Sequence, residues 1–272
     1  MQSANNYQRR YGLATPLINV MTAAADKTTR QILRDFGEVD HLQVSKKGAM
    51  DFVTETDKRV ERILYQQLKK ARPDFGFLME ESGEEEGNSE YRWVIDPLDG
   101  TTNFMHAIPY FCVSIGVEKK THHGSEIVAA VIYDPVHDEM FVAEKGKGAF
   151  VNTRRLQVSR RETDFYFVTG TSRRRGQASK ECSSLADYAD GMDCVIRRSG
   201  AAALDLAYVA AGRYDAAWFP KLQKWDLAAG ILLVKEAGGV MSLPCGTQGN
   251  PYETLSILAG SATACDALLN RK

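Results

Sequence analysis

The sequence predicts an α+β protein in which helices and sheets form mixed layers. Three observations lead to this prediction. Two helical patterns open the chain, a strand meander occupies residues 110–150, and strands alternate with helices from residue 164 onward. A meander followed by alternating strands and helices favours mixed α and β layers over a simple doubly wound sheet. At 272 residues, the chain is long enough to bury one large hydrophobic core.

The first helix is predicted to begin at Pro16. Apolar residues recur at helical spacing as far as Ile32, and this pattern runs through an alanine triplet at 23–25 that would otherwise pass for a signal-peptide cleavage site. Residues 51–57 open a second helix, which ends before Pro73.

The remaining elements are predicted from apolar, aromatic and β-branched runs between glycine and proline residues. In the first half, strands are expected at 75–79, 91–95, 111–118, 126–133 and 139–144. In the second half, strands are expected at 164–169, 194–197, 215–219, 240–243 and 255–259, and helices at 180–187, 201–211, 226–237 and 262–270.

The composition is that of an ordinary globular protein. Hydrophobic residues make up 44% and charged residues 25%, which excludes disordered and collagen-like chains. With 34 basic and 35 acidic side chains the net charge is −1, so we expect no general attraction to nucleic acid or to anionic membranes. The five cysteines include no C-x-x-C pair, which favours reduced thiols and a cytoplasmic location.

The strongest local signal is the segment W-V-I-D-P-L-D-G-T-T-N-F at residues 93–104. Asp96 and Asp99 follow a hydrophobic strand, with Pro97 between them. Two carboxylates this close repel each other in a partly buried corner unless a cation lies between them. All-oxygen ligands suit Mg²⁺ better than zinc. In the structural alternative, Asp99 caps a helix and Asp96 lies on the surface.

The residues directly after this pair predict an anion site. Gly100, Thr101 and Thr102 would present backbone N–H groups at a helix start, where anions bind. A metal site joined to an anion site suggests a phosphate ester as the ligand.

Three further acids could join the same cage of carboxylates. Glu80 follows the predicted strand at 75–79, where a side chain can point into a cleft. Asp57 and Asp226 stand near predicted helix starts, so each could instead be a helix cap.

Other motifs are weaker. The five histidines show no metal-ligand spacing, and there is no nucleophile elbow, phosphate-binding P-loop or dinucleotide fingerprint. Arginines at 173–175 could hold a phosphate or simply be solvated. Arginines at 197–198 precede small residues at 199–203, which would let a ligand approach the backbone closely.

Taken together, these segments resemble the inositol monophosphatase family. D-P-L-D-G-T-T-N-F at 96–104 is similar to its first signature, and W-D-L-A-A-G at 225–230, running into E-A-G-G at 236–239, to its second. Segments 51–57 and 80–83 are similar to the other two segments typical of this family, and they occur in the same order along the chain. Residues 199–215 resemble the bacterial SuhB-like branch in particular, and the resemblance extends over nearly the whole chain.

The resemblance implies a layered α-β-α-β-α sandwich that forms a single phosphatase unit over residues 1–272. A layer of about residues 1–150 would carry most metal ligands, and a layer of about 151–272 would carry Asp226 and the substrate-facing residues. The family is typically a homodimer that hydrolyses small phosphate esters with Mg²⁺ and is inhibited by Li⁺. The implied activity is an inositol-phosphate phosphatase.

The resemblance also implies roles for individual residues, which fall into three groups. Glu80, Asp96 and the Leu98 carbonyl would hold one Mg²⁺, and Asp96, Asp99 and Asp226 would hold a second. Glu80 would also contribute to a third ion. The catalytic residues would be Glu80, Thr101 and Asp57, with the Thr101 hydroxyl and Asp57 orienting the attacking water. Substrate contacts would come from Leu98, Asp99, Gly100, Thr101, Arg197, Ala202 and Asp226.

One departure leaves the substrate open. Seven residues before Asp226, inositol-specific members carry a glutamate that binds a ring hydroxyl, but here the residue is Phe219, which cannot accept that hydrogen bond. Fructose bisphosphate, NADP, histidinol phosphate and 3′-phosphoadenosine phosphate are therefore alternatives. Arginines 173–175 could favour a second phosphate.

The SuhB-like branch implies a different class of function. Such proteins act in transcription antitermination and ribosomal RNA maturation through contacts with transcription elongation factors. The alternative is therefore a protein-binding role in which catalysis is dispensable.

Overall fold

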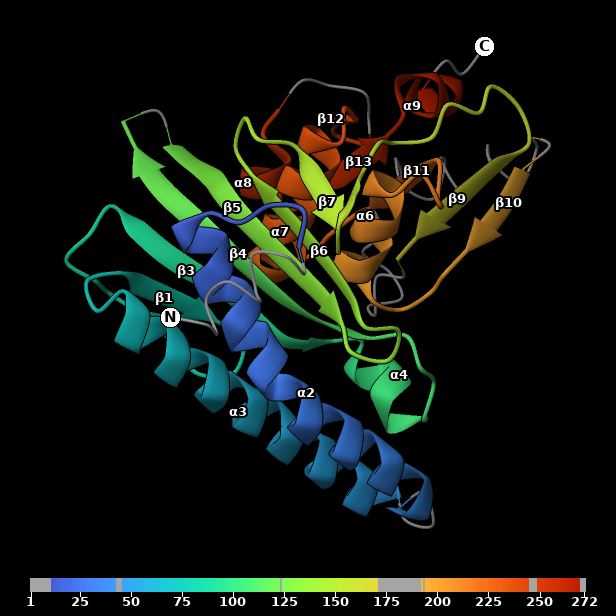
Figure 1. The fold of residues 1–272 in the computed structure, drawn as a ribbon. Helices are drawn as coiled ribbons and strands as arrows, with labels where there is room; N and C mark the ends of the chain where they lie inside the picture. The colour runs from blue at the N-terminus through green and yellow to red at the C-terminus, as the bar shows by residue number, and fades with distance from the viewer. Residues whose placement is uncertain are drawn as a thin grey trace.

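Two β-sheets and three helical layers make up the chain in the computed structural model, which describes residues 11–42, 46–122, 124–170, 192, 194–244 and 249–269. The layers alternate as helices, sheet, helices, sheet and helix (Figure 1). The predicted α-β-α-β-α sandwich is confirmed.

The larger sheet has eight strands in the order β2-β1-β3-β4-β5-β6-β7-β8. These are β1 (Gly76–Met79), β2 (Gly83–Glu85), β3 (Tyr91–Asp99), β4 (Cys112–Thr121), β5 (Gly124–Asp134), β6 (Glu139–Glu144), β7 (Ala149–Val151) and β8 (Arg154–Arg155). Among the described strands of this sheet, only β1 and β3 pair in parallel. The predicted meander is confirmed as antiparallel β4, β5 and β6.

The smaller sheet has five strands in the order β10-β9-β11-β13-β12. These are β9 (Phe165–Thr169), β10 (Cys194–Arg197), β11 (Ala216–Phe219), β12 (Val240–Ser242) and β13 (Ile257–Gly260). Parallel pairing of β10, β9 and β11 fits the alternation of strands and helices in this half of the sequence.

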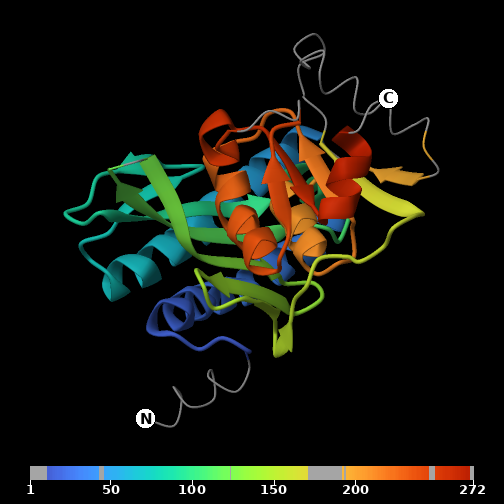
Figure 2. The ribbon, with the colours of Figure 1, turned by 90° about the horizontal axis from the view of Figure 1, so that it is seen from above.

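The helices separate and enclose the sheets (Figures 1 and 2). The outer face of the larger sheet is covered by α2 (Pro16–Leu42) and α3 (Lys46–Ala71). Between the sheets lie α6 (Ala202–Ala210) and α7 (Lys224–Glu236), and α9 (Ala262–Leu269) covers the far face of the smaller sheet. Two short helices, α4 (Thr101–Met105) and α8 (Pro251–Thr254), follow β3 and β12.

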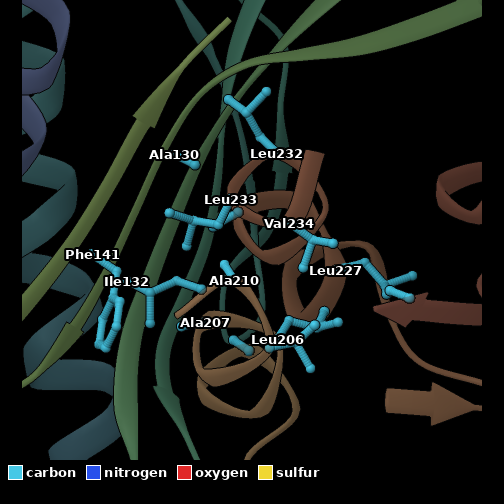
Figure 3. Packing of buried hydrophobic residues seen from close by; sticks show 14 of the residues in the cluster. Ala130, Ile132, Phe141, Leu206, Ala207, Ala210, Leu227, Leu232, Leu233 and Val234 are labelled. Carbon is cyan, nitrogen blue, oxygen red and sulfur yellow. The ribbon is translucent and has the colours of Figure 1, made fainter. Parts of the chain in front are cut away.

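Strand alternation explains how one sheet is buried on both faces. Along β3, Trp93 and Ile95 pack with α2 and α3, whereas Val94 faces the layer of α6 and α7. Figure 3 shows the second interface, where Ile132 of β5 and Phe141 of β6 approach the side chains of α6 and α7. Both faces therefore need apolar residues.

Close packing fixes α7 against the larger sheet. A Cβ on Gly116 of β4 would lie only 2.8 Å from the Cβ of Ala228, so this position admits no side chain without moving the helix. Close by, the hydroxyl of Ser114 donates to the carbonyl of Trp225 at 3.3 Å. These contacts set the position of the first turn of α7, which carries Asp226.

Two local differences from the sequence expectations bear on the site. Helix α3 begins at Lys46 instead of within 51–57, because lysine, alanine and methionine are strong helix formers; Asp57 therefore lies inside a helix and is not its cap. Strand β3 continues to Asp99, with a register shift between Asp96 and Asp99 around Pro97. The helix expected at 180–187 and the arginines at 173–175 lie outside the described residues.

In the part of the chain that the structure describes, no helix has the length and apolar character needed to cross a membrane.

Candidate metal centre

A cavity of about 1040 Å³ opens where α3, the end of β3, the start of α6 and the start of α7 meet. Nine of the ten predicted site residues line it: Asp57, Glu80, Asp96, Leu98, Asp99, Gly100, Thr101, Ala202 and Asp226. The structure therefore brings together residues that span 170 positions of sequence.

Three aspartates form the centre of this cavity. One carboxylate oxygen from each of Asp96, Asp99 and Asp226 lies within 4.8 Å of the others, a separation that a single cation can bridge. Asp96 and Asp99 come from the irregular end of β3, and Asp226 comes from the first turn of α7. The shift in register around Pro97 lets two residues three apart contribute to the same cluster.

Backbone N–H groups hold one oxygen of each carboxylate. Asp96 accepts from the N–H of Leu98 at 3.0 Å, Asp99 from Ala203 at 2.6 Å, and Asp226 from Gln223 at 2.8 Å. The side chain of Asp96 also hydrogen-bonds to those of Glu80 and Asp226, so these acids contact one another directly in the cluster. Asp226 is therefore not the N-cap that the sequence suggested: Gln223 is the N-cap of α7, and Asp226, the third residue of the helix, accepts its N–H in a capping box.

The carboxylates strongly perturb one another. Burial is the largest cause that raises the pKa of Asp96 and Asp99 well above the usual range, and the charges of Glu80 and Asp226 raise it further. Burial likewise raises the pKa of Glu80 and Asp226. Without a cation, this cavity therefore favours protonated acids.

Asp57 provides an independent test of whether a cation fits. Its side chain is only 6% exposed, and its Oδ1 has no hydrogen-bond partner among the described residues. Burial, followed by the charges of Glu81 and Glu80, raises its pKa to about 8. An orphaned, buried carboxylate oxygen in a cavity of hard oxygen donors is satisfied by a hard divalent cation or by a water bound to one. The donor set fits Mg²⁺.

The turn after β3 has the shape expected of an anion site. Gly100 has a φ of 100°, and a Cβ there would lie 3.0 Å from the carbonyl oxygen of Tyr110, so glycine is required. The hydroxyl of Thr101 donates to the carbonyl of Leu98 at 3.1 Å, which links two predicted site groups. No hydrogen bond joins Thr101 to Asp57 in the described part of the structure, so their predicted pairing stays a prediction.

Arg197 is the predicted site residue that the structure does not bring to the cavity wall. It is exposed at the edge strand β10, where its Nε donates to the hydroxyl of Tyr166 at 2.7 Å. Its role in substrate binding stays a prediction.

The cavity also contains residues that were not predicted from the sequence. Lys221 is exposed and is the only basic residue among the described residues of the lining. Asp205 is 1% exposed, accepts a hydrogen bond from the Tyr110 hydroxyl at 2.6 Å, and has its pKa raised by burial to about 7. The one sequence signal near Lys221 is the phenylalanine two residues before it, Phe219, which replaces the glutamate of inositol-specific family members.

The fold and the site together define an α+β protein with a carboxylate metal centre beside an anion-binding turn. The chain belongs to the inositol monophosphatase family, whose model matches residues 13–272. This family is metal-dependent, in agreement with the acidic cluster.

Known proteins of two kinds are similar to the chain. Inositol-1-monophosphatase from Rhizobium meliloti is 47% identical over 256 residues, covering 93% of this chain and 94% of the relative. Nus factor SuhB from Pseudomonas aeruginosa is 43% identical over 263 residues, with coverages of 93% and 94%.

Solved structures show the same fold. The suhB protein from Bartonella henselae has a TM-score of 0.83 at 46% identity, covering 94% of this chain and 97% of the neighbour. Inositol monophosphatase from Anabaena has a TM-score of 0.79 at 34% identity, with 93% coverage of both chains.

The raised pKa values predict an unusual pH dependence of stability. Because the pKa of Asp57 is about 8 in the folded protein against an ordinary 3.8, the folded state binds more protons than the unfolded state between these values. Without metal, the melting temperature should therefore fall by several degrees from pH 5 to pH 8. Saturating Mg²⁺, which binds only the folded state, should raise it more at pH 8 than at pH 5.

Scanning calorimetry with and without EDTA measures this effect. Asp57→Asn is the control, since it removes one of the acids with a raised pKa and should make the slope shallower in the absence of metal. A melting temperature that stays constant or rises from pH 5 to pH 8 without metal would show that these acids are not strained by their burial.

Proposed function

We propose that the protein is a Mg²⁺-dependent phosphomonoesterase that releases inorganic phosphate from inositol monophosphate or a related small phosphate ester. The observation that carries this proposal is the convergence of Asp96, Asp99 and Asp226 beside the turn at Gly100 and Thr101. Family membership and the inositol-1-monophosphatase relatives support it.

The carboxylates of the cavity can be assigned to separate Mg²⁺ ions. Glu80, Asp96 and the Leu98 carbonyl would hold one Mg²⁺, and Asp96, Asp99 and Asp226 would hold a second, with Glu80 contributing to a third. When bound, such ions lower the pKa of the water that attacks phosphorus and stabilise charge on the leaving oxygen.

Residues of the chain supply orientation and proton transfer. The N–H groups of Gly100 and Thr101 would hold phosphate oxygens at the end of β3. The hydroxyl of Thr101, anchored by Leu98, would orient the attacking water. Oδ1 of Asp57 has no hydrogen-bond partner among the described residues, so it is the atom that would accept a proton from that water.

The substrate's alcohol would lie against a wall that differs from an inositol-specific site. Phe219 is 1% exposed and packs so closely on Gly170 that a Cβ there would lie 2.8 Å from the ring. This wall offers no acceptor at Phe219 for a ring hydroxyl, whereas the Lys221 ammonium would attract a second anionic group. Fructose bisphosphate and other esters that carry a second phosphate group therefore remain candidate substrates.

A second function in protein binding is favoured by the relatives named Nus factor SuhB. Such a role would involve transcription elongation factors and an external surface, so it is compatible with catalysis in the cavity. We further propose that the protein is a cytoplasmic homodimer and that Li⁺ inhibits it, as is typical of the family.

The metal mechanism predicts a large loss of activity when one central carboxylate is removed. Asp96→Asn should lower kcat for phosphate release more than about 100-fold, because the residue would serve two ions, and EDTA should abolish the wild-type activity. Glu126→Gln, a change at the ion pair with Lys145, should leave kcat unchanged. A phosphate-release assay decides this, and wild-type rates in Asp96→Asn would refute the metal site.

The specificity argument predicts the effect of restoring an acceptor at position 219. Phe219→Glu should raise kcat/KM for inositol monophosphate about tenfold relative to fructose bisphosphate, the worth of one hydrogen bond to a charged group. Phe219→Leu removes the ring without adding an acceptor and should give no such gain. If folded Phe219→Glu protein keeps the wild-type ratio, position 219 does not select the alcohol.

A further inference from the structure

A buried glutamate outside the predicted ligand set lies directly behind the metal centre. Glu61 is 3% exposed and follows Asp57 by four residues on α3, so both side chains lie on the same face of this helix. Residues of this face pack against the turn between β1 and β2, where Glu80 lies.

Both oxygens of Glu61 bind this turn. Oε2 accepts the backbone N–H of Glu81 at 2.9 Å, and Oε1 accepts the hydroxyl of Ser82. On the other side of the turn, the N–H of Glu80 donates to the carbonyl of Ile95 at 3.2 Å. Glu80 is therefore fastened to β3 through its own backbone and to α3 through the two residues that follow it.

The pairing of Met79 with Gly83 closes the turn at the sheet, whereas on the side of α3 the turn borders open space. A second cavity of about 420 Å³ lies behind it, lined by Glu61, Glu81 and Ser82 among others, and Glu81 lines the main cavity as well. The turn thus separates two open spaces. Without the bonds from Glu61, it would have room to move away from Asp57 and Asp96.

The choice of a carboxylate at this position is itself informative. Glu61 stands near Asp57, Glu80 and Glu81, where another buried acid is electrostatically unfavourable. A glutamine would be less costly in charge, but it offers a single acceptor atom and would turn an N–H₂ group toward one of the two donors. Only a carboxylate offers two acceptor oxygens, one for each of these donors.

We propose that Glu61 is a positioning residue of the metal centre: its two hydrogen bonds hold the turn at 80–82 against α3, so that Glu80 faces the same cavity as Asp57 and Asp96. This inference rests on the proposed function, since it takes Glu80 as a metal ligand. It assigns Glu61 no contact with metal or substrate.

The test compares two variants that loosen the turn in different ways. Glu61→Gln removes a charge and one acceptor, whereas Ser82→Ala removes a single hydrogen bond and leaves the charge intact. The control is Asp215→Asn, because Asp215 is also fully buried and bonded, to the N–H of Tyr166 at 2.6 Å and to Arg161 at 3.0 Å, but lies at the smaller sheet.

Calorimetric titration of each EDTA-treated protein with Mg²⁺ gives the affinity directly, without reference to turnover. The Kd should rise about tenfold in Glu61→Gln and about threefold in Ser82→Ala. Asp215→Asn should lose thermal stability but keep its Kd within about twofold of the wild type. Hydrogen exchange at the Glu81 amide should accelerate in Glu61→Gln, because that amide loses its acceptor or has it weakened.

The possible outcomes separate the inference from the proposed function. A wild-type Kd in both Glu61→Gln and Ser82→Ala would overturn the positioning role while leaving the metal site intact. So would weaker binding in Glu61→Gln alone with unchanged exchange at Glu81, since charge would then explain the effect. If Glu61→Gln does not fold, Ser82→Ala carries the test. Absence of Mg²⁺ binding by the wild type would refute the proposed function itself.

Discussion

Repulsion among buried carboxylates is the constraint on which the rest of the structure depends. Asp57, Glu80, Asp96, Asp99 and Asp226 line one cavity, and burial raises the pKa of every one of them. Left alone, these groups would neutralise themselves by holding protons. A divalent cation resolves the conflict by supplying positive charge, so the affinity for metal and the strain of the metal-free cavity have the same physical origin.

Such a cavity persists only because the layers around it leave the carboxylates little freedom. The irregular end of β3 presents Asp96 and Asp99 together, and the close approach of Gly116 to Ala228 fixes the helix that carries Asp226. Hydrogen bonds from the turn to Glu61 would do the same for Glu80. These carboxylates thus depend on three layers of the fold: the outer helices, the larger sheet and the helices between the sheets.

The sequence was most informative where the site is contiguous. Asp96 and Asp99 could be predicted because a hydrophobic strand ends in two acids beside a glycine turn, and the antiparallel meander could be predicted from its apolar runs. Asp57 and Asp226 were ambiguous, because acids also cap helices. Asp226 lies in the acidic cluster and also accepts the N–H of Gln223 at the start of α7. Periodicity could not locate the start of α3, where good helix formers extend the helix to Lys46.

Residues whose importance arises from tertiary contacts escaped prediction. Glu61 looks like any charged residue of an amphipathic helix until the turn at 80–82 is placed against it. Lys221 gains its meaning from being the only basic group among the described residues of an acidic cavity. Arg197 lies on an edge strand beside Tyr166, outside the cavity lining, and its role at the substrate stays a prediction. These placements depend on long-range packing, which local patterns do not encode.

Counting the protons released when Mg²⁺ binds tests the central claim most directly. Calorimetric titrations at pH 7 in buffers of different ionisation enthalpy give this number for the wild-type protein. Since the pKa of Asp57 is about 8 and burial raises those of its neighbours, the cavity should release at least about one proton per protein on binding Mg²⁺. Binding without any release of protons would contradict the account, because the acids would then already be ionised and unstrained without the metal.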